Sequence, residues 1–358
     1  MNNKNVYDKE FIEELLIKVA QRMTSIEKGS INESCPIGIV DVNNWEWPQG
    51  VGMYGLYRYY QDSGRTEYLD FLVHWYECRL AEGLPEKNVN TMSPMLTLAF
   101  LYESTGNIKY LSVCEEWASW VMNEMPRTKE GALQHIVTGE INEQQIWDDT
   151  LFMTVLFLAK MGRILNKQNY CQEAVKQFLI HIKYLYDKKS GLWFHGWSFI
   201  ENGNFANALW ARGNCWYTAG VVDYIEMMGL EGAVKQYLID TLIAQVEKLG
   251  ELQRHDGMWH TLLDDPDSYV EASATAGFGY GILKAVRKGY ISDKYVNIGK
   301  KALCAVINRI AEDGTVLEVS YGTGMGKTLD EYRNIPICPM TYGQALAILF
   351  LSEGLKVI

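Results

Sequence analysis

The stretch Val51-Gly-Met-Tyr-Gly-Leu-Tyr-Arg-Tyr-Tyr-Gln-Asp-Ser-Gly64 is apolar on nearly every side and ends at a glycine suited to a helix C-cap. A helix that is apolar all round has to be buried on all sides. The segments on either side of it, 8–23 and 65–81, instead place their apolar residues on a single helical face. We therefore predict a buried inner helix with half-exposed outer helices beside it.

The same pair of segments recurs along the chain. The predicted inner helices are 51–64, 94–106, 151–162, 216–229, 274–289 and 342–354, and each ends at a glycine. The amphipathic segments that precede them are 8–23, 65–81, 109–121, 170–186, 232–249 and 293–310. A spacing of about 40 to 70 residues is too irregular for an open solenoid. We predict an all-α closed ring, an (α/α)6 barrel of six inner and six outer helices, as one domain over residues 1–358, with only short β pieces in its loops.

Composition narrows the classes of function. The net charge of −11 argues against nucleic acid or an anionic membrane as partner. No apolar segment approaches the roughly 18 residues of a membrane span, and no signal-peptide core is found near Met1. The 7 cysteines are scattered without CxxC spacing, which indicates reduced thiols in the cytoplasm and no zinc site. We expect no metal and no cofactor. The 11 Trp and 22 Tyr suggest an aromatic-lined carbohydrate site.

The segments that lead into the six inner helices should meet at one end of the ring. Nearly all the Trp and His that lie outside the outer helices fall in these leading segments: 43–50, 87–93, 135–149, 193–216, 255–271 and 321–342. Core packing would spread Trp along the helix faces, so this clustering favours a ligand cleft. The glycines of 322–326 lack the preceding buried strand of a phosphate loop.

The leading segment 135–149 ends on two adjacent carboxylates, Asp148 and Asp149, before an apolar run. Charge at the mouth of a buried element is costly unless it caps that element or takes part in chemistry. One interpretation is that Asp148, Asp149 and Thr150 form an N-cap cluster, as helix starts favour. The other is a catalytic carboxylate, and the sequence alone does not separate the two acids.

Four motifs carry a resemblance to a known family: Trp147-Asp-Asp-Thr-Leu-Phe-Met153, Trp45-Glu-Trp-Pro-Gln-Gly50, Trp193-Phe-His-Gly-Trp197 and Trp210-Ala-Arg-Gly-Asn214. They resemble the unsaturated rhamnogalacturonyl hydrolases, family 105 of the glycoside hydrolases and close kin of the unsaturated glucuronyl hydrolases of family 88. The resemblance covers essentially the whole chain, and it implies the same (α/α)6 barrel.

The resemblance also implies a reaction. Such enzymes remove a 4,5-unsaturated uronic acid from the non-reducing end of lyase-generated oligosaccharides by hydrating its double bond. It points to Asp149 as the catalytic acid, with Asp148 as a cap or orienting group. Where the family usually has a second carboxylate, this chain has Asn90, which can orient but not shuttle protons. We expect the apolar cleft to raise the pKa of Asp149.

Substrate roles follow from the same motifs. Arg212 would pair with the uronate carboxylate through its guanidinium fork, or would hold loop carbonyls as a structural residue. The other residues expected to bind the sugar are Trp47, His135, Trp147, His195, Trp210 and Trp216. We expect the binding partner to be a small oligosaccharide substrate. We expect the protein itself to be a monomer or a homodimer. The alternatives are another (α/α)6 enzyme, namely an inverting glycosidase using Asp149 with Glu46 or a histidine-dependent sugar epimerase, and a non-catalytic carbohydrate-binding protein.

Overall fold

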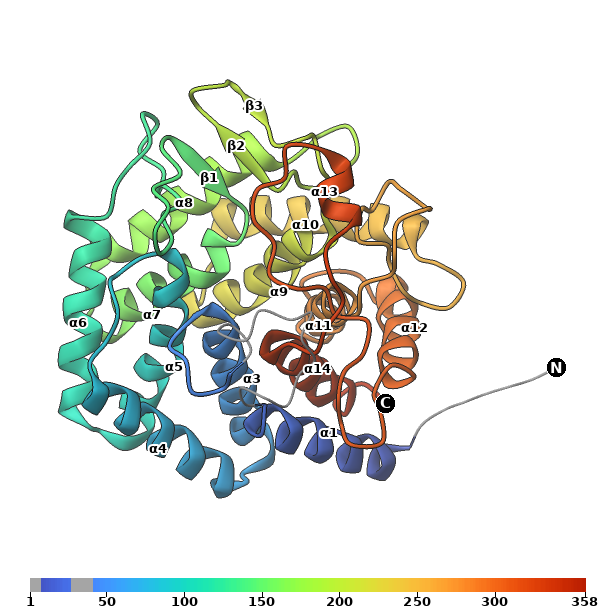
Figure 1. Ribbon diagram of the computed structural model, residues 1–358, viewed down its shortest axis with the longest axis horizontal. Helices are drawn as coiled ribbons and strands as arrows, with labels where there is room; N and C mark the ends of the chain where they lie inside the picture. The colour runs from blue at the N-terminus through green and yellow to red at the C-terminus, as the bar shows by residue number, and fades with distance from the viewer. Residues whose placement is uncertain (1–7, 27–40) are drawn as a thin grey trace.

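The computed structural model describes residues 8–26 and 41–358, and in these residues the chain is mostly helical. A central ring is formed by the inner helices α3 (Trp47–Ser63), α5 (Val89–Thr105), α7 (Leu156–Ile164), α9 (Ala211–Met228), α11 (Ala272–Arg287) and α14 (Thr341–Gly354). Each inner helix packs against the next, and α14 packs against α3, which closes the ring (Figure 1). The (α/α)6 barrel is confirmed, and the single domain over 1–358 stays a prediction.

The outer layer consists of α1 (Lys9–Thr24), α4 (Thr66–Glu82), α6 (Ile108–Asn123), α8 (Gln168–Leu185), α10 (Gly232–Leu252) and α12 (Val296–Ile307), the last preceded by the 3-10 turn η2 (Asp293–Tyr295). Each packs on the inner helix that precedes it in the chain, except α1, which packs on α14. The short helix α13 (Leu329–Arg333) lies in the segment that leads to α14. Among the described residues, no helix is both long enough and apolar enough to cross a membrane.

Glycines end the inner helices less uniformly than predicted. Four of them lie at or just past a helix end with a left-handed backbone: Gly64, Gly106, Gly229 and Gly289. The prediction is wrong for Gly162, which lies inside α7, whereas Gly354 is the last residue of α14, as predicted, but without a left-handed backbone. A Cβ on Gly162 would lie 2.7 Å from the sulfur of Cys171 on α8. This glycine therefore lets the outer helix approach closely and does not end the inner one.

The end of the ring at which the inner helices begin carries a small sheet. Its strands β1 (Gln145–Trp147), β2 (Gly196–Ser198) and β3 (Gly203–Asn204) are antiparallel in the order β1-β2-β3, with Trp147 opposite Gly196. These are the short β pieces expected in the loops. The sheet brings the segment before α7 next to the segment before α9, so the residues leading into two inner helices share one wall.

The interior of the ring is filled below this end. Asp223 on α9 accepts hydrogen bonds from the hydroxyl groups of Tyr54 on α3 (2.7 Å) and Tyr280 on α11 (2.6 Å), and it pairs with Lys284. Since α3 and α9 lie on opposite sides of the six-helix ring, these bonds cross its interior. A cavity at the other end of the inner helices is therefore blind.

Candidate active site

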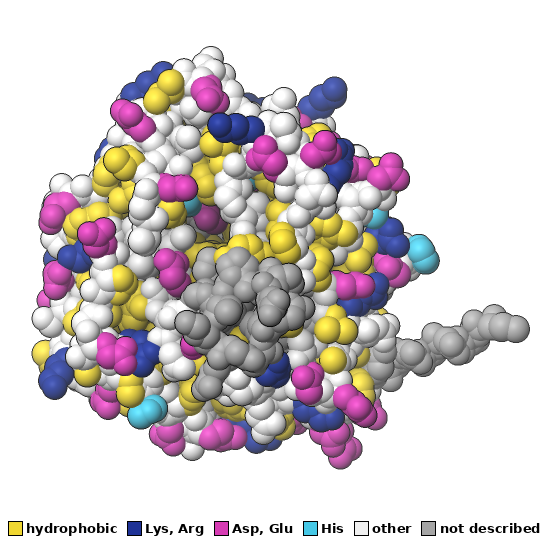
Figure 2. All heavy atoms as spheres, in the orientation of Figure 1, with side chains coloured by type: hydrophobic (Ala, Val, Ile, Leu, Met, Phe, Trp, Pro, Cys, Tyr) yellow, Lys and Arg dark blue, Asp and Glu magenta, His cyan; other side chains and the backbone are white. Residues whose placement is uncertain are grey.

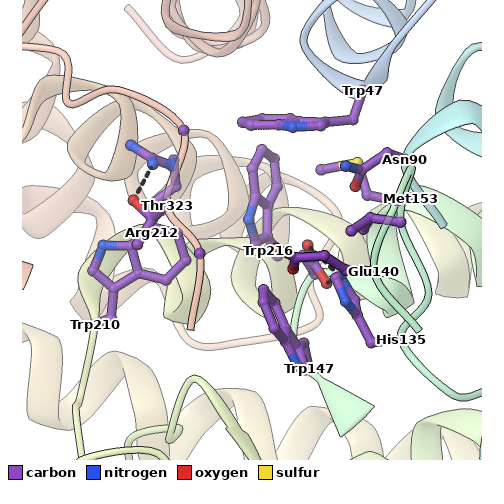
Figure 3. A pocket seen from close by; sticks show the side chains of 14 residues that line it. Trp47, Asn90, His135, Glu140, Trp147, Met153, Trp210, Arg212, Trp216 and Thr323 are labelled. Carbon is purple, nitrogen blue, oxygen red and sulfur yellow. Dashed lines mark hydrogen bonds and ion pairs between the residues drawn. The ribbon is translucent and has the colours of Figure 1, made fainter. Parts of the chain in front are cut away.

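A pocket lies where the inner helices begin. It is lined by Trp47, Asn90, His135, Val137, Glu140, Trp147, Asp149, Met153, Trp210, Arg212, Trp216, Gly322, Thr323 and Gly324 (Figure 3). Figure 2 shows this face hollowed near the centre of the ring, with acidic side chains beside the hollow. Five of the six leading segments therefore converge on one cavity, as predicted, whereas the segment 255–271 contributes none of the lining residues.

Helix starts position several of these side chains. Trp47 is the first residue of α3, and Asn90 and Arg212 are the second residues of α5 and α9. The sequence placed them in loops before the helices. A first helical turn that faces a cavity has no apolar periodicity, so the sequence pattern shows the helix only from its second turn onwards.

Asp149 and His135 form the polar centre of the pocket. His135 Nε2 lies 3.3 Å from Oδ1 and 3.4 Å from Oδ2 of Asp149. The imidazole stacks on Trp147, with ring centroids 3.9 Å apart and an interplanar angle of 3°. The amide nitrogen of Asn142 lies 3.5 Å from His135 Nδ1. Because the Asn142 amide donates, Nδ1 of His135 accepts and carries no proton. The ring proton is then on Nε2, which can donate it to Asp149.

The pKa of Asp149 moves in the opposite direction to our expectation. Burial by itself raises it, but attraction to His135, the hydrogen bond from His135 and weaker attraction to His195 and His181 together lower the pKa below its usual value. Burial lowers the pKa of His195 to about 3 and that of His181 to about 4, so both are neutral near pH 7. His135 is therefore the partner that counts, and Asp149 is ionised in the protein without substrate.

Asp148 points away from the pocket, into the protein. Its side chain lies against Gly213 of α9, where a Cβ would come within 2.0 Å of Asp148 Oδ2, so the Arg-Gly-Asn motif needs a glycine there. Among the described residues, no side chain hydrogen-bonds to either Asp148 oxygen. Burial, and secondarily the charge of Asp149, raise the pKa of Asp148 well above its usual value. The Asp148 carboxyl therefore holds its proton more tightly in the folded protein than in the unfolded chain.

The predicted N-cap cluster is not formed. The inner helix here starts with a π-helical turn, η1 (Leu151–Val155), and its N-cap residue Thr150 makes no side-chain capping bond. It is the backbone carbonyl of Asp149 that accepts from the N–H groups of Phe152 and Met153. Neither carboxylate is used as a cap, so the capping interpretation is wrong for both and the Asp149 side chain is left facing the pocket.

Arg212 is held almost completely by the protein. Its Nη1 donates to the carbonyl (3.0 Å) and hydroxyl (2.5 Å) of Ser320 and lies 3.5 Å from Glu271. Its Nη2 donates to the carbonyl of Tyr321 (2.8 Å) and the hydroxyl of Thr323 (2.9 Å). The side chain is 0% exposed. This geometry favours the structural alternative, in which Arg212 fastens the loop before α14 and supplies charge behind the pocket wall.

Aromatic rings form the remaining walls. Trp47 stacks on Tyr342 of α14 at 4.5 Å and meets Trp216 edge-on at 6.1 Å. The guanidinium carbon of Arg212 lies 4.7 Å from the ring centre of Trp210 and 4.8 Å from that of Tyr342. Trp47 is thus the half-buried ring most open to a sugar face, whereas Trp147 and Trp216 are only 5% and 1% exposed and Trp210 clamps Arg212.

His195 does not line the pocket. It is 1% exposed, its Nδ1 lies 2.7 Å from the hydroxyl of Tyr332, and its ring meets Trp147 edge-on. It therefore supports the Trp147 wall from behind, and its expected contact with the sugar has no support here. The pocket residues that the sequence interpretation missed are Val137, Glu140, Met153 and Gly322–Gly324, of which Glu140 alone carries a charge.

Comparison with known proteins gives a consistent result. Residues 19–358 match the family described as Glycosyl Hydrolase Family 88. The unsaturated rhamnogalacturonyl hydrolase YesR of Bacillus subtilis is 34% identical over 315 residues, which is 87% of this chain and 90% of that protein. Crystal structures from Klebsiella pneumoniae and Salmonella enterica, both described as a possible member of the GH105 family, are each 47% identical over 100% of this chain and 96% and 97% of theirs, with TM-scores of 0.94 and 0.95.

Proposed function

Because the chain belongs to glycosyl hydrolase family 88, we propose that it removes a 4,5-unsaturated uronic acid from the non-reducing end of lyase-generated oligosaccharides. The chain is a glycoside hydrolase, and the resemblance to family 105 and its family 88 kin is confirmed. We propose rhamnose as the second sugar, because the B. subtilis relative is an unsaturated rhamnogalacturonyl hydrolase.

The observation that carries this proposal is a blind, aromatic-walled pocket with Asp149 facing into it. The bonds across the ring at Asp223 close the pocket below, so an oligosaccharide can only enter by its end. Stacked rings such as Trp47 give a sugar the flat apolar surface that it prefers. A blind pocket of this kind suits the release of one terminal sugar.

In the proposed reaction Asp149 is both acid and base. It donates a proton to C4 of the double bond and, as a carboxylate, takes a proton from the water that adds at C5. The hemiketal so formed opens, and the glycosidic bond is lost as the sugar rearranges. Asp149 must first gain a proton, which its lowered pKa opposes in the empty pocket. The substrate carboxylate and the loss of water on binding both act to raise that pKa.

The alternatives have less support from the geometry. Glu46, the second carboxylate of an inverting mechanism, caps α3 by accepting from the Trp47 N–H at 3.1 Å and does not line the pocket. An epimerase would need two histidines at the sugar, but His195 lies behind Trp147. Asn90 lines the pocket, where its amide is suited to orienting the water or the sugar.

The proposed reaction can be followed directly by ultraviolet absorbance, because the double bond of the substrate is conjugated. Lyase-generated unsaturated galacturonyl-rhamnose absorbs in the ultraviolet, and hydration removes that absorbance. We expect the absorbance to fall with the wild-type protein and to stay constant with Asp149→Asn. The saturated disaccharide serves as control and should not be cleaved. Cleavage of the saturated sugar, or an unchanged absorbance with the wild-type protein, would contradict the proposal.

The cellular setting is proposed on chemical grounds. Cys78, Cys114, Cys171 and Cys215 carry free thiols, and Cys35 lies outside the described residues. Free thiols fit a reducing compartment, so we keep the cytoplasm as the proposed location. A small oligosaccharide is the proposed partner, and the state of monomer or homodimer stays a prediction.

A further inference from the structure

The charges of the pocket are divided between its two sides. Figure 3 shows Arg212, Thr323 and Trp210 on one side and Glu140, His135 and Trp147 on the other, with Trp216 between them. The guanidinium of Arg212 is the only cationic Lys or Arg group among the lining residues that the structure describes, and Glu140 and Asp149 are the carboxylates. An anionic group on the ligand is therefore attracted towards Arg212 and repelled near Glu140.

Glu140 is held at this place by the backbone. Val137 and Glu140 exchange two backbone hydrogen bonds, of 3.0 and 3.1 Å, around a tight turn in which Gly139 has a φ of 81°. The turn is fastened to the start of α5, because the Asn88 amide donates to the Thr138 hydroxyl at 3.1 Å. The backbone of Glu140 therefore belongs to a fixed part of the wall, next to the helix that carries Asn90.

The carboxylate of Glu140 has no compensating charge. In residues 8–26 and 41–358 it forms no ion pair, and none of the described side chains hydrogen-bonds to it. It is exposed, whereas the side chain of Asp149 is only 18% exposed and lies deeper. A terminal sugar whose double bond reaches Asp149 thus leaves the next sugar towards the mouth, where Glu140 is the exposed carboxylate of the lining.

We propose that Glu140 determines specificity at the second sugar, by accepting hydrogen bonds from a neutral sugar and excluding one that carries a sulfate or carboxylate. The inference rests on the proposed function and narrows its substrate class. A sugar hydroxyl can donate to a carboxylate in a charge-assisted hydrogen bond. An anionic substituent cannot, and in a partly enclosed pocket it is repelled by a carboxylate that has no cation beside it.

Two probes and two variants test the proposal. The probes are unsaturated galacturonyl-rhamnose and the same disaccharide with a sulfate ester on its rhamnose. The variants are Glu140→Gln and, as a matched control, Glu143→Gln, which removes the same charge from an exposed residue of the same loop that does not line the pocket. The ratio of kcat/KM for the neutral probe to that for the sulfated probe is measured for each protein.

We expect the wild-type ratio to be at least about tenfold and Glu140→Gln to lower it about tenfold, as one like-charge contact in a partly enclosed site predicts. The neutral probe should lose affinity through a higher KM while kcat is retained. Glu143→Gln should keep the wild-type ratio. An unchanged ratio in Glu140→Gln would overturn the proposal, and so would a collapse of kcat on the neutral probe, which would place Glu140 in the chemistry. If the wild-type protein consumes neither probe, the proposed function fails and this inference fails with it.

Discussion

Replacing Arg212 by Lys separates the two roles considered for this residue. Lys keeps the charge but has one terminal nitrogen, so it can reach the Ser320 side or the Thr323 side of the loop and not both. At least two of the five hydrogen bonds from the guanidinium are lost. Hydrogen bonds from charged groups contribute about 1.5–3 kcal/mol each, which predicts a loss of about 3–6 kcal/mol in the free energy of unfolding. That is a large part of a typical total of about 5–15 kcal/mol.

Urea unfolding with parallel kinetics measures both roles. Arg309→Lys is the control, because Arg309 forms ion pairs at 3.2 and 2.9 Å outside the pocket and its side chain is 20% exposed. Pairs of this kind contribute about 0–1 kcal/mol. We expect Arg212→Lys to unfold at clearly lower urea and to lose activity equally on the free acid and its methyl ester. Wild-type stability combined with a loss on the free acid alone would refute the structural role and make Arg212 a direct ligand of the carboxylate.

Three further predictions concern the adjacent acids and their histidine. Asp149→Asn should lower kcat by about 10² to 10⁴ without lowering the melting temperature, and a near-normal kcat would mean that another group supplies the proton. His135→Gln removes the attraction that lowers the pKa of Asp149, so Asp149 keeps its proton to higher pH and the basic limb of the pH–rate profile should move to higher pH; an unmoved limb would show that the pair is not coupled in catalysis. The pKa of Asp148 is higher in the folded protein than in the unfolded chain, so the folded state binds its proton more tightly. This carboxyl therefore lowers the free energy of unfolding as the pH rises above the pKa that Asp148 has in the unfolded chain. Asp148→Asn should therefore stabilise the protein at pH 7 and not at pH 3, as measured by urea midpoints, and equal effects at both pH values would contradict a raised pKa of Asp148.

The ring of helices could be predicted because the burial of each helix determines which of its residues are apolar. A helix surrounded by other helices is apolar on all sides, as in 51–64, and an outer helix is apolar on one side, as in 65–81. The predicted starts of the inner helices were less accurate. Trp47 and Arg212 lie in first turns that line the pocket, where apolar residues do not recur with the helical period. Gly162 was misread because a glycine that admits a neighbouring helix looks the same in the sequence as one that ends a helix.

The site was predicted only in part, because proximity in space is what defines it. The motif around Asp149 and the clustering of Trp identified the pocket. The partners of Arg212 lie 59 to 111 residues further along the chain, so no local pattern could show that its fork is occupied. Glu140 resembles any exposed loop glutamate in the sequence. The lowered pKa of Asp149 depends on the stacked position of His135, which the spacing of 14 residues does not fix.

The contact between α3 and α14 has a consequence for folding of the chain during its synthesis on the ribosome. These helices lie side by side in the ring, yet about 280 residues separate them in the chain (Figure 1). At about 5–20 residues per second, α3 waits roughly 15 to 55 seconds for its neighbour to be synthesised. During that interval the apolar flank of α3 has no partner, and the platform that Trp47 forms with Tyr342 does not exist. Nascent chains should therefore depend on chaperones that shield apolar helices, and pulse-labelled chains stalled before residue 341 should bind them while full-length chains are released.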